Sequence, residues 1–210
     1  MKSSCEICGS KQLERVLDLG DHPLCDDLIP LNSSKVSKEY PIKIIFCNNC
    51  YTAYQDEEVS KYELFHKNYH YRAKMTGSVL LGMKDLVNSL EDVLGSLENK
   101  NVLDIGCNDG SLLDFFSKKG CNTYGIEPTD AALESKHKTY NMFFDKKSAL
   151  LLKEEIKNID IITFTNVFAH IEDLNSLLSG IKTLMNENTL LVIENHYLGS
   201  VLRKNQFDTF

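Results

Sequence analysis

Four of the seven cysteines fall into two pairs of identical spacing. Cys5 and Cys8 form one C-x-x-C pair, and Cys47 and Cys50 form the other. Two such turns aim four sulfurs at one point, which is the usual way to build a tetrahedral zinc site from thiolates. Because four thiolates leave no open coordination position, we expect this zinc to be structural rather than catalytic. A coincidental pair or a redox dithiol is the alternative interpretation.

The remaining cysteines, Cys25, Cys107 and Cys121, stand alone in the sequence. Cys25 and His22 lie between the two pairs, but their spacing gives no positive reason to include them as ligands. Residues 1–70 are rich in loops and contain three of the four prolines, so they can bury little apolar surface. Metal binding would supply the folding energy that this segment lacks.

A second group of residues has the types and spacing of a cofactor-binding turn. Asp104, Gly106 and Gly110 fit the D-x-G-x-x-x-G form of an S-adenosylmethionine loop, in which a Cβ atom would clash with the ligand. Asn108 stands where a dinucleotide-binding G-x-G-x-x-G motif has its middle glycine, which disfavours NAD. The predicted contacts in this turn are Asp104, Gly106, Asn108, Asp109, Gly110, Ser111 and Leu112.

The next β-rich run supports this interpretation of the turn. It ends at Glu127, at the distance beyond the loop where an acidic side chain reaches ribose hydroxyls. Pro128 is expected to cap the strand against the adenine. Asp109 has two interpretations, because it could lie near the amino-acid end of the cofactor or cap the following helix.

Two later runs complete the predicted cofactor site. Phe143 and Phe144 are placed at the end of the third strand, where adenine would stack, although core packing is the better explanation for one of them. Asn166 and Val167 follow the fourth strand. Ligands bind at the carboxyl ends of parallel strands, so we expect these two residues beneath the methyl donor.

The elements that must position these residues follow an alternating pattern. Between residues 71 and 97, apolar residues recur at three- and four-residue steps, which predicts an amphipathic helix. After residue 100, short β-rich runs alternate with helical patterns such as SLLDFFSKKG and DAALESKHK, and the third run is YNMFFD. This alternation predicts a parallel sheet with helices on both faces.

The predicted fold class is therefore α/β. We expect a Rossmann-like class I methyltransferase sheet, incomplete with about five parallel strands, preceded by a small zinc-binding module. The module would cover residues 1–70, a linker helix residues 71–98 and the cofactor-binding domain residues 99–210.

Composition excludes some classes of partner. The formal net charge is -7 and the sequence pI is about 5.4, which argues against binding to the phosphate backbone of nucleic acid. No apolar run reaches the roughly 20 residues that span a bilayer, and the first residues lack the apolar stretch of a secretory signal. We therefore expect a cytoplasmic protein that binds neither nucleic acid nor membrane, and whose oligomeric state the sequence leaves open.

Together these motifs resemble one family, the zinc-containing sugar C-methyltransferases that act on nucleotide-linked keto-deoxysugars. The resemblance covers essentially the whole chain. It is specific because the segments occur together in one order. Besides the cysteine pairs, the matching text is LDLGDHPLCDDL, NYHYRAKMTGS, IGCNDGSLL, GIEPTDAA, NVFAHIEDL and the closing NQFDTF.

The resemblance implies C-methylation beside a keto group, which requires a base and a donor that stabilises the enolate. It suggests His170, with Tyr69 or Tyr71, for these roles. Glu194, Asn195 and His196 end the fifth predicted strand, where they could line the acceptor pocket. A helix-start role for His170 and interdomain packing for the tyrosines are the alternatives. Members of the family continue past the closing motif into a Tyr-His-Glu-His segment that supplies the general base. We therefore expect this sequence to lack the last part of such a protein and to turn over weakly.

Three functions remain open from the sequence. The first is a sugar C-methyltransferase of polysaccharide or deoxysugar biosynthesis, with S-adenosylmethionine and zinc as cofactors and a nucleotide-linked sugar as its small-molecule acceptor. The second is an O- or N-methyltransferase that acts on a sugar or another small acceptor and needs no carbon base. The third is a zinc-knuckle binding protein with a catalytically dead methyltransferase fold.

Overall fold

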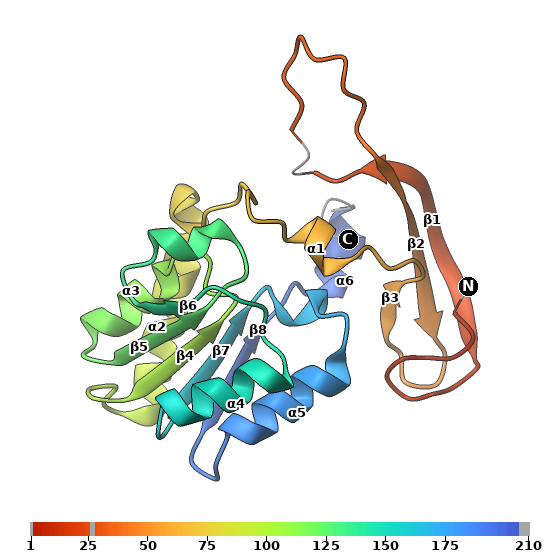
Figure 1. Ribbon diagram of the computed structural model, residues 1–210. Helices are drawn as coiled ribbons and strands as arrows, with labels where there is room; N and C mark the ends of the chain where they lie inside the picture. The colour runs from red at the N-terminus through yellow and green to blue at the C-terminus, as the bar shows by residue number, and fades with distance from the viewer. Residues whose placement is uncertain (1, 26–27, 206–210) are drawn as a thin grey trace. The chain divides into compact units, whose positions relative to one another are not determined.

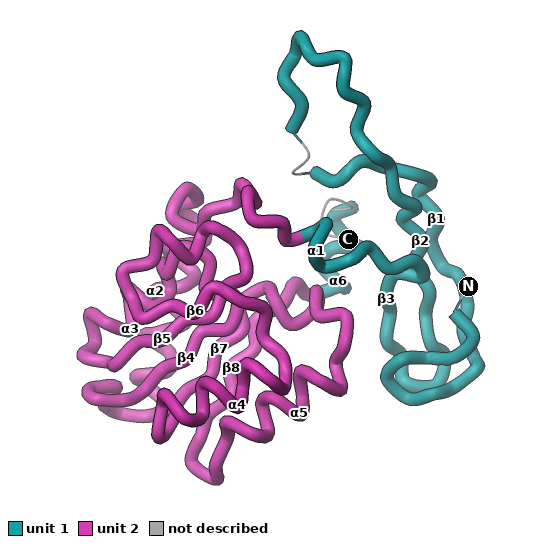
Figure 2. Tube along the Cα trace, in the orientation of Figure 1, with its two compact units in different colours: residues 1–64, 198–210 teal, residues 65–197 magenta. Residues whose placement is uncertain are grey.

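A computed structural model describes residues 2–25 and 28–205 of the chain. The described residues form two compact units, one drawn from residues 1–64 and 198–210 and the other spanning Phe65–Tyr197 (Figure 2). Of the closing motif at residues 205–210, only Asn205 lies within the described part. No helix in the described part of the chain is long and apolar enough to cross a membrane.

The first unit is built on a small antiparallel sheet. Its strands are β1 (Leu13–Pro23), β2 (Glu39–Cys47) and β3 (Ala53–Gln55), in the order β1-β2-β3, and its helices are α1 (Lys61–Leu64) and α6 (Leu198–Lys204). No residue of β1 is buried, whereas Ile44, Ile45 and Cys47 of β2 are. This sheet therefore buries few apolar side chains, as expected from the sequence.

The second unit contains a five-stranded parallel sheet with the order β6-β5-β4-β7-β8 (Figure 1). Its strands are β4 (Asn101–Ile105), β5 (Asn122–Ile126), β6 (Lys138–Tyr140), β7 (Ile161–Thr165) and β8 (Leu190–Glu194). Its helices are α2 (Gly77–Leu94), α3 (Ser111–Lys118), α4 (Lys146–Glu155) and α5 (Leu174–Leu184), and its 3-10 turns are η1 (Ala73–Met75), η2 (Asp130–Glu134) and η3 (Phe168–His170). The predicted α/β fold class is confirmed.

Helices cover both faces of this sheet, because successive strand residues point to opposite sides. On β4, Leu103 and Ile105 pack in the cluster that includes α4 and α5, whereas Val102 packs with α2 and α3 on the other face. Figure 1 shows α4 and α5 together on one face. The carboxyl ends of the five parallel strands share one edge of the sheet, and ligands of this fold bind at that edge.

Three elements differ from their sequence-based prediction. The third strand ends at Tyr140, so Phe143 and Phe144 do not end it as predicted. The predicted helix DAALESKHK is instead the short 3-10 turn η2. The Leu133 side chain in this turn is 76% exposed, so it cannot anchor a longer helix to the core. The helix expected from residue 71 begins at Gly77, since Thr76 has an extended backbone.

Candidate functional site

The four paired cysteines meet in the first unit. Their sulfur atoms all lie within 4.8 Å of one another, and two of the pairs, Cys5 with Cys50 and Cys8 with Cys47, are both 3.6 Å apart. Zinc binds thiolates at about 2.3 Å, which puts tetrahedral sulfur atoms about 3.8 Å apart. The cluster therefore fits one zinc ion. Cys25 is exposed and is not part of the cluster.

Each cysteine pair lies in a turn with the same backbone hydrogen bonds. The Cys5 N–H donates to Ser10 O at 2.8 Å, and the Cys47 N–H donates to Thr52 O at 2.9 Å. Gly9 and Tyr51, the residues directly after the second cysteine of each pair, have φ angles of 72° and 60°. The two turns thus present their sulfurs in the same way, which is the form expected of zinc knuckles.

The cofactor turn joins β4 to α3 at the carboxyl edge of the parallel sheet. Gly106 and Gly110 have φ angles of 75° and 80°, which glycine adopts without a Cβ clash. A Cβ on Gly106 would lie 2.4 Å from a methyl carbon of Val167, and one on Gly110 would lie 2.6 Å from Ser135 Oγ. Both glycines are therefore required by the backbone and by neighbouring side chains of the protein itself.

Glu127 follows β5 directly and is only 6% exposed. Its Oε2 accepts the backbone N–H of Asn108 at 3.0 Å, and its Oε1 accepts the N–H and the hydroxyl of Thr129 at 2.9 and 2.7 Å. The carboxylate is thus fixed beside the glycine turn at the edge where ligands of this fold bind. A buried carboxylate that these donors hold in place is suited to accept a further hydrogen bond from the hydroxyl group of a ligand.

Asp104 lies within β4 and is fully buried beneath the turn. The hydroxyl of Thr163 on β7 donates to its Oδ1 at 2.6 Å. Burial, with a smaller contribution from the charge of Glu127, raises the pKa of Asp104 to about 7. Asp104, predicted as a cofactor contact, is therefore a buried carboxyl group whose hydrogen bond with Thr163 joins β4 to β7.

Asp109 and Ser111 shape the start of α3. The Asp109 carboxylate accepts the backbone N–H of Ser111 at 3.2 Å and its hydroxyl at 2.6 Å, and its other oxygen accepts the N–H of Lys74 at 3.0 Å. The N-cap of α3 is Gly110, which has no side-chain cap, so Asp109 orders the turn before the helix and does not cap the helix itself. Leu112 packs in the core of the α2–α3 face, so only its backbone can reach a ligand.

The remaining predicted cofactor residues have different surroundings. Phe144 lies in the core, with its ring edge-on to Phe164 at a centroid distance of 6.4 Å, so the structure does not offer it as a free adenine platform. Val167 packs against Gly106. Asn166 is exposed with a φ of 54° and donates its N–H to Glu194 O at 2.8 Å. Pro128, which directly follows Glu127, is half-buried.

Two of the three predicted acid–base residues, Tyr69 and His170, contact the ring of Phe65, a residue that the sequence did not single out. The Phe65 ring contacts Tyr69 at a centroid distance of 5.7 Å and His170 at 5.9 Å. Desolvation and the nearby His196 lower the pKa of His170. Burial and the charge of Asp109 raise the pKa of Tyr71. Tyr69 and His170 are thus brought together, while Tyr71 lies by the cofactor turn.

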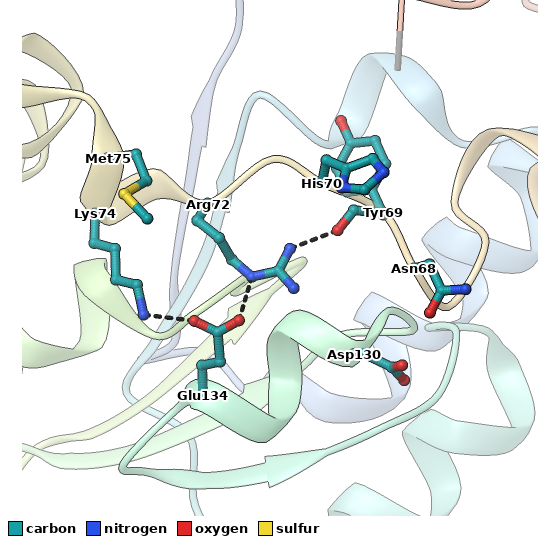
Figure 3. Close-up of a pocket in the computed structure, with 8 residues that line it drawn as sticks. All are labelled: Asn68, Tyr69, His70, Arg72, Lys74, Met75, Asp130 and Glu134. Atoms are coloured by element: carbon teal, nitrogen blue, oxygen red, sulfur yellow. Dashed lines mark hydrogen bonds and ion pairs between the residues drawn. The ribbon is translucent and has the colours of Figure 1, made fainter. Parts of the chain in front are cut away.

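An open pocket of about 710 Å³ lies next to Tyr69 (Figure 3). Arg72 and Lys74 both pair with Glu134 of η2. These partners are separated by about sixty residues, so no local sequence pattern could have indicated them. The pocket is lined by Asn68, Tyr69, His70, Arg72, Lys74, Met75, Asp130 and Glu134.

Comparison with known proteins first defines the class. The chain is similar to the PH0226 protein from Pyrococcus horikoshii OT3, with a TM-score of 0.53 and 16% identity over 71% of this chain and 72% of that one. It is also similar to the plantazolicin methyltransferase BpumL in complex with a pentazolic desmethylPZN analog and SAH, with a TM-score of 0.51 and 17% identity over 64% of this chain and 53% of that one. These similarities show the methyltransferase fold.

The family follows from the sequence profiles. The family described as "Methyltransferase domain" matches residues 71–209, and the family described as "Putative zinc binding domain" matches residues 5–65. The chain belongs to the methyltransferase domain family, whose members depend on S-adenosylmethionine, and it carries a four-cysteine zinc site.

One curated relative aligns along almost the whole sequence. The C-methyltransferase NovU of Streptomyces niveus is 25% identical over 210 residues, which cover 98% of this chain and 50% of that protein. The chain thus spans about half the length of this relative.

Proposed function

We propose that the protein is an S-adenosylmethionine-dependent methyltransferase that methylates the carbon beside a keto group of a nucleotide-linked sugar, in polysaccharide or deoxysugar biosynthesis. The observation that carries this proposal is the extent of the similarity to NovU, a C-methyltransferase. It includes both the cysteine module and the cofactor unit over 98% of the chain. We also infer a cytoplasmic location, because reducing compartments keep cysteine thiolates available as zinc ligands.

The residues at the carboxyl edge of the sheet fit the cofactor. Glu127 would accept a ribose hydroxyl, and the backbone of the turn from Gly106 to Gly110 would lie against the ligand. Asn166 and Val167 would lie beneath the methyl donor. When bound, S-adenosylmethionine supplies an activated methyl group, so the protein has mainly to orient the acceptor and make it nucleophilic.

Methylation at carbon requires that a proton be removed beside the keto group. His170 suits the role of base because its lowered pKa keeps the imidazole neutral and able to accept that proton. The enolate oxygen that forms needs a hydrogen-bond donor. Tyr71 suits this role because its raised pKa keeps the phenol protonated, and Tyr69 is the alternative donor.

The zinc site has no part in this chemistry. The four cysteines of the cluster would supply four sulfur ligands to one zinc ion, which would leave no position for an acceptor oxygen. We infer that zinc instead stabilises the first unit, whose sheet buries few apolar side chains.

Two measurements test the proposed function. Calorimetry should detect binding of S-adenosylmethionine and of its demethylated product, S-adenosylhomocysteine, but not of NAD. Mass spectrometry after incubation with methyl-labelled cofactor and a panel of nucleotide-linked keto-sugars should find the label on carbon. Label on oxygen or nitrogen would instead support an O- or N-methyltransferase. Failure to bind S-adenosylhomocysteine would contradict the proposal as a whole.

A further inference from the structure

The segment 69–75, here called the tyrosine segment, carries both predicted tyrosines and the turn η1. Its backbone is bound by side chains rather than by a neighbouring strand. Arg72 donates from Nη1 to Tyr69 O at 2.5 Å and to Tyr71 O at 2.9 Å, while its Nε donates to Glu134 at 2.6 Å (Figure 3). One guanidinium therefore braces the segment and ties it to η2.

Asn108 of the cofactor turn binds the same segment from another element. Its Oδ1 accepts the N–H of Ala73 at 3.0 Å, and its Nδ2 donates to Tyr71 O at 3.1 Å. The side-chain amide thus makes the pair of bonds, to residues two apart, that a neighbouring β-strand would make. Asp109 adds a third bond by accepting the N–H of Lys74 at 3.0 Å. We call the two Asn108 bonds the amide clasp.

The backbone of Asn108 is bound in turn by Glu127, whose Oε2 accepts its N–H at 3.0 Å. A carboxylate has about four acceptor positions, two on each oxygen. Among the described residues, Thr129 uses both positions on Oε1 and Asn108 uses one on Oε2. The remaining position is therefore on the oxygen that already holds Asn108. A ribose hydroxyl bound there would share its acceptor with the residue that clasps the tyrosine segment.

We propose that Asn108 is a positioning residue, which transmits occupancy of the Glu127 ribose site to the tyrosine segment through the amide clasp. This inference rests on the proposed function, because it requires the cofactor to bind at Glu127. Cofactor binding fixes the Asn108 backbone, the clasp then fixes Tyr71 and Ala73, and the tyrosines are ordered when the methyl donor is present. The side chain of Asn108 is thus assigned to ordering the tyrosine segment, near the methyl acceptor, rather than to direct contact with the cofactor.

Asn108→Gly separates the clasp from the backbone. Asn108 has a φ of 50°, which glycine adopts freely, and the backbone N–H that bonds Glu127 is retained. Asn99→Gly is the matched control, since Asn99 has a φ of 62°, is exposed, and lies in the loop before β4. Asn108→Asp is a second variant, which keeps the acceptor for Ala73 but cannot donate to Tyr71 O. It provides the same test if the glycine variant does not fold.

The experiment is amide hydrogen exchange of the tyrosine segment, with and without S-adenosylhomocysteine at concentrations that saturate each variant. In the wild type and in Asn99→Gly, we expect the ligand to slow exchange in this segment by at least about fivefold. In Asn108→Gly the slowing should disappear even though the site is full, and in Asn108→Asp it should be reduced.

Two results would overturn the inference. If Asn108→Gly exchanges faster but keeps the same ratio with and without ligand, the clasp is only structural. If the variant merely needs more ligand and then shows full protection, Asn108 contacts the cofactor directly. Calorimetry on the wild type distinguishes these results from failure of the proposed function. If the wild type does not bind S-adenosylhomocysteine, the ribose site itself is wrong and no coupling to it exists.

Discussion

Two acidic residues at the carboxyl edge of the sheet differ in how the protein supports their charge. Glu127 accepts three hydrogen bonds from the described residues, whereas Asp104 accepts one, from Thr163. Burial without enough donors favours the neutral acid, which explains why the pKa of Asp104 is raised to about 7. The same edge of the sheet therefore holds one carboxylate suited to binding and one carboxyl group suited to joining strands.

Replacing Glu127 with Gln tests the binding role. The amide keeps one acceptor oxygen but turns an N–H group toward the donors of Asn108 or Thr129, so a bond to the ligand and a bond within the protein both weaken. We expect calorimetry to show a loss of roughly 1–3 kcal/mol in affinity for S-adenosylhomocysteine. Glu155→Gln, at an exposed residue of α4, is the control. Equal affinities for the two variants would contradict the ribose assignment.

Replacing Asp104 with Asn tests the buried acid. Its folded-state pKa of about 7 lies above the usual value of 3.8, so the unfolded chain loses this proton first. The contribution of Asp104 to the free energy of unfolding should therefore fall as pH rises from about 4 to about 7. Asp104→Asn lacks this contribution. The free energy of unfolding of the variant, minus that of the wild type, should therefore increase by up to roughly 4 kcal/mol over this pH range.

Chemical denaturation at a series of pH values measures this difference. The variant and wild-type curves should run parallel above about pH 7, where Asp104 is ionised in both states of the wild type. Asp92→Asn, at an exposed residue of α2, should reproduce the wild-type slope. If the Asp104→Asn curve runs parallel to the wild-type curve over the whole pH range, the pKa of Asp104 is not raised in the folded protein.

At the scale of elements, the parallel sheet was predictable because strands and helices alternate with their own periods. The third strand was placed too late, since YNMFFD is more apolar than Lys138–Tyr140, which forms the edge strand β6. Position along β5 rather than hydrophobicity fixes that register, as Tyr124 pairs with Lys138. The glycine turn after β4 and the acidic residue after β5 could be predicted because their spacing in the sequence is local. The amide clasp was not found, because it joins residues about 35 apart through side-chain geometry.

The zinc knuckles allow a prediction at this scale. Gly9 has a φ of 72° with nothing within 4 Å of its ideal Cβ, so Gly9→Ala changes backbone strain and not packing. We expect a loss of about 1 kcal/mol in the folding of this knuckle. Because zinc binding and folding are coupled in such modules, competition with a chelator should show a similar loss in zinc affinity.

Gly82→Ala in the middle of α2 is the matched control. Its ideal Cβ also meets nothing within 4 Å, but its backbone is helical. Alanine should therefore stabilise the second unit by about 0.5–1 kcal/mol and leave zinc affinity unchanged. If Gly9→Ala binds zinc as tightly as the wild type, the left-handed residue is not required by the knuckle.

At the scale of the whole molecule, the two units obtain their stability from different sources. The second unit has two clusters of buried apolar side chains, one on each face of its sheet. In the first unit, β1 has no buried residue, and two of the buried groups, Cys5 and Cys47, belong to the four-cysteine cluster. Metal should therefore control the folding of the first unit and have little effect on the core of the second.

Removal of zinc tests this division. Treatment with a strong chelator should unfold the first unit, because binding free energy is folding free energy in a module without a large apolar core. Hydrogen exchange should then show fast exchange in β1, β2 and β3, while β4 and β7 remain protected. Affinity for S-adenosylhomocysteine should change by no more than about twofold, as expected for independent sites.

Two serine variants make the same test without a chelator. Cys47→Ser removes a buried ligand of the cluster, whereas Cys25→Ser changes an exposed cysteine outside it. Only the first should lose zinc, measured by elemental analysis, and only the first should show fast exchange in the three antiparallel strands. Since thiolates supply all four ligands, one hydroxyl in their place leaves the coordination sphere incomplete. If β4 and β7 also lost protection in Cys47→Ser, the two units would fold as one, and zinc would stabilise the cofactor site as well as the cysteine module.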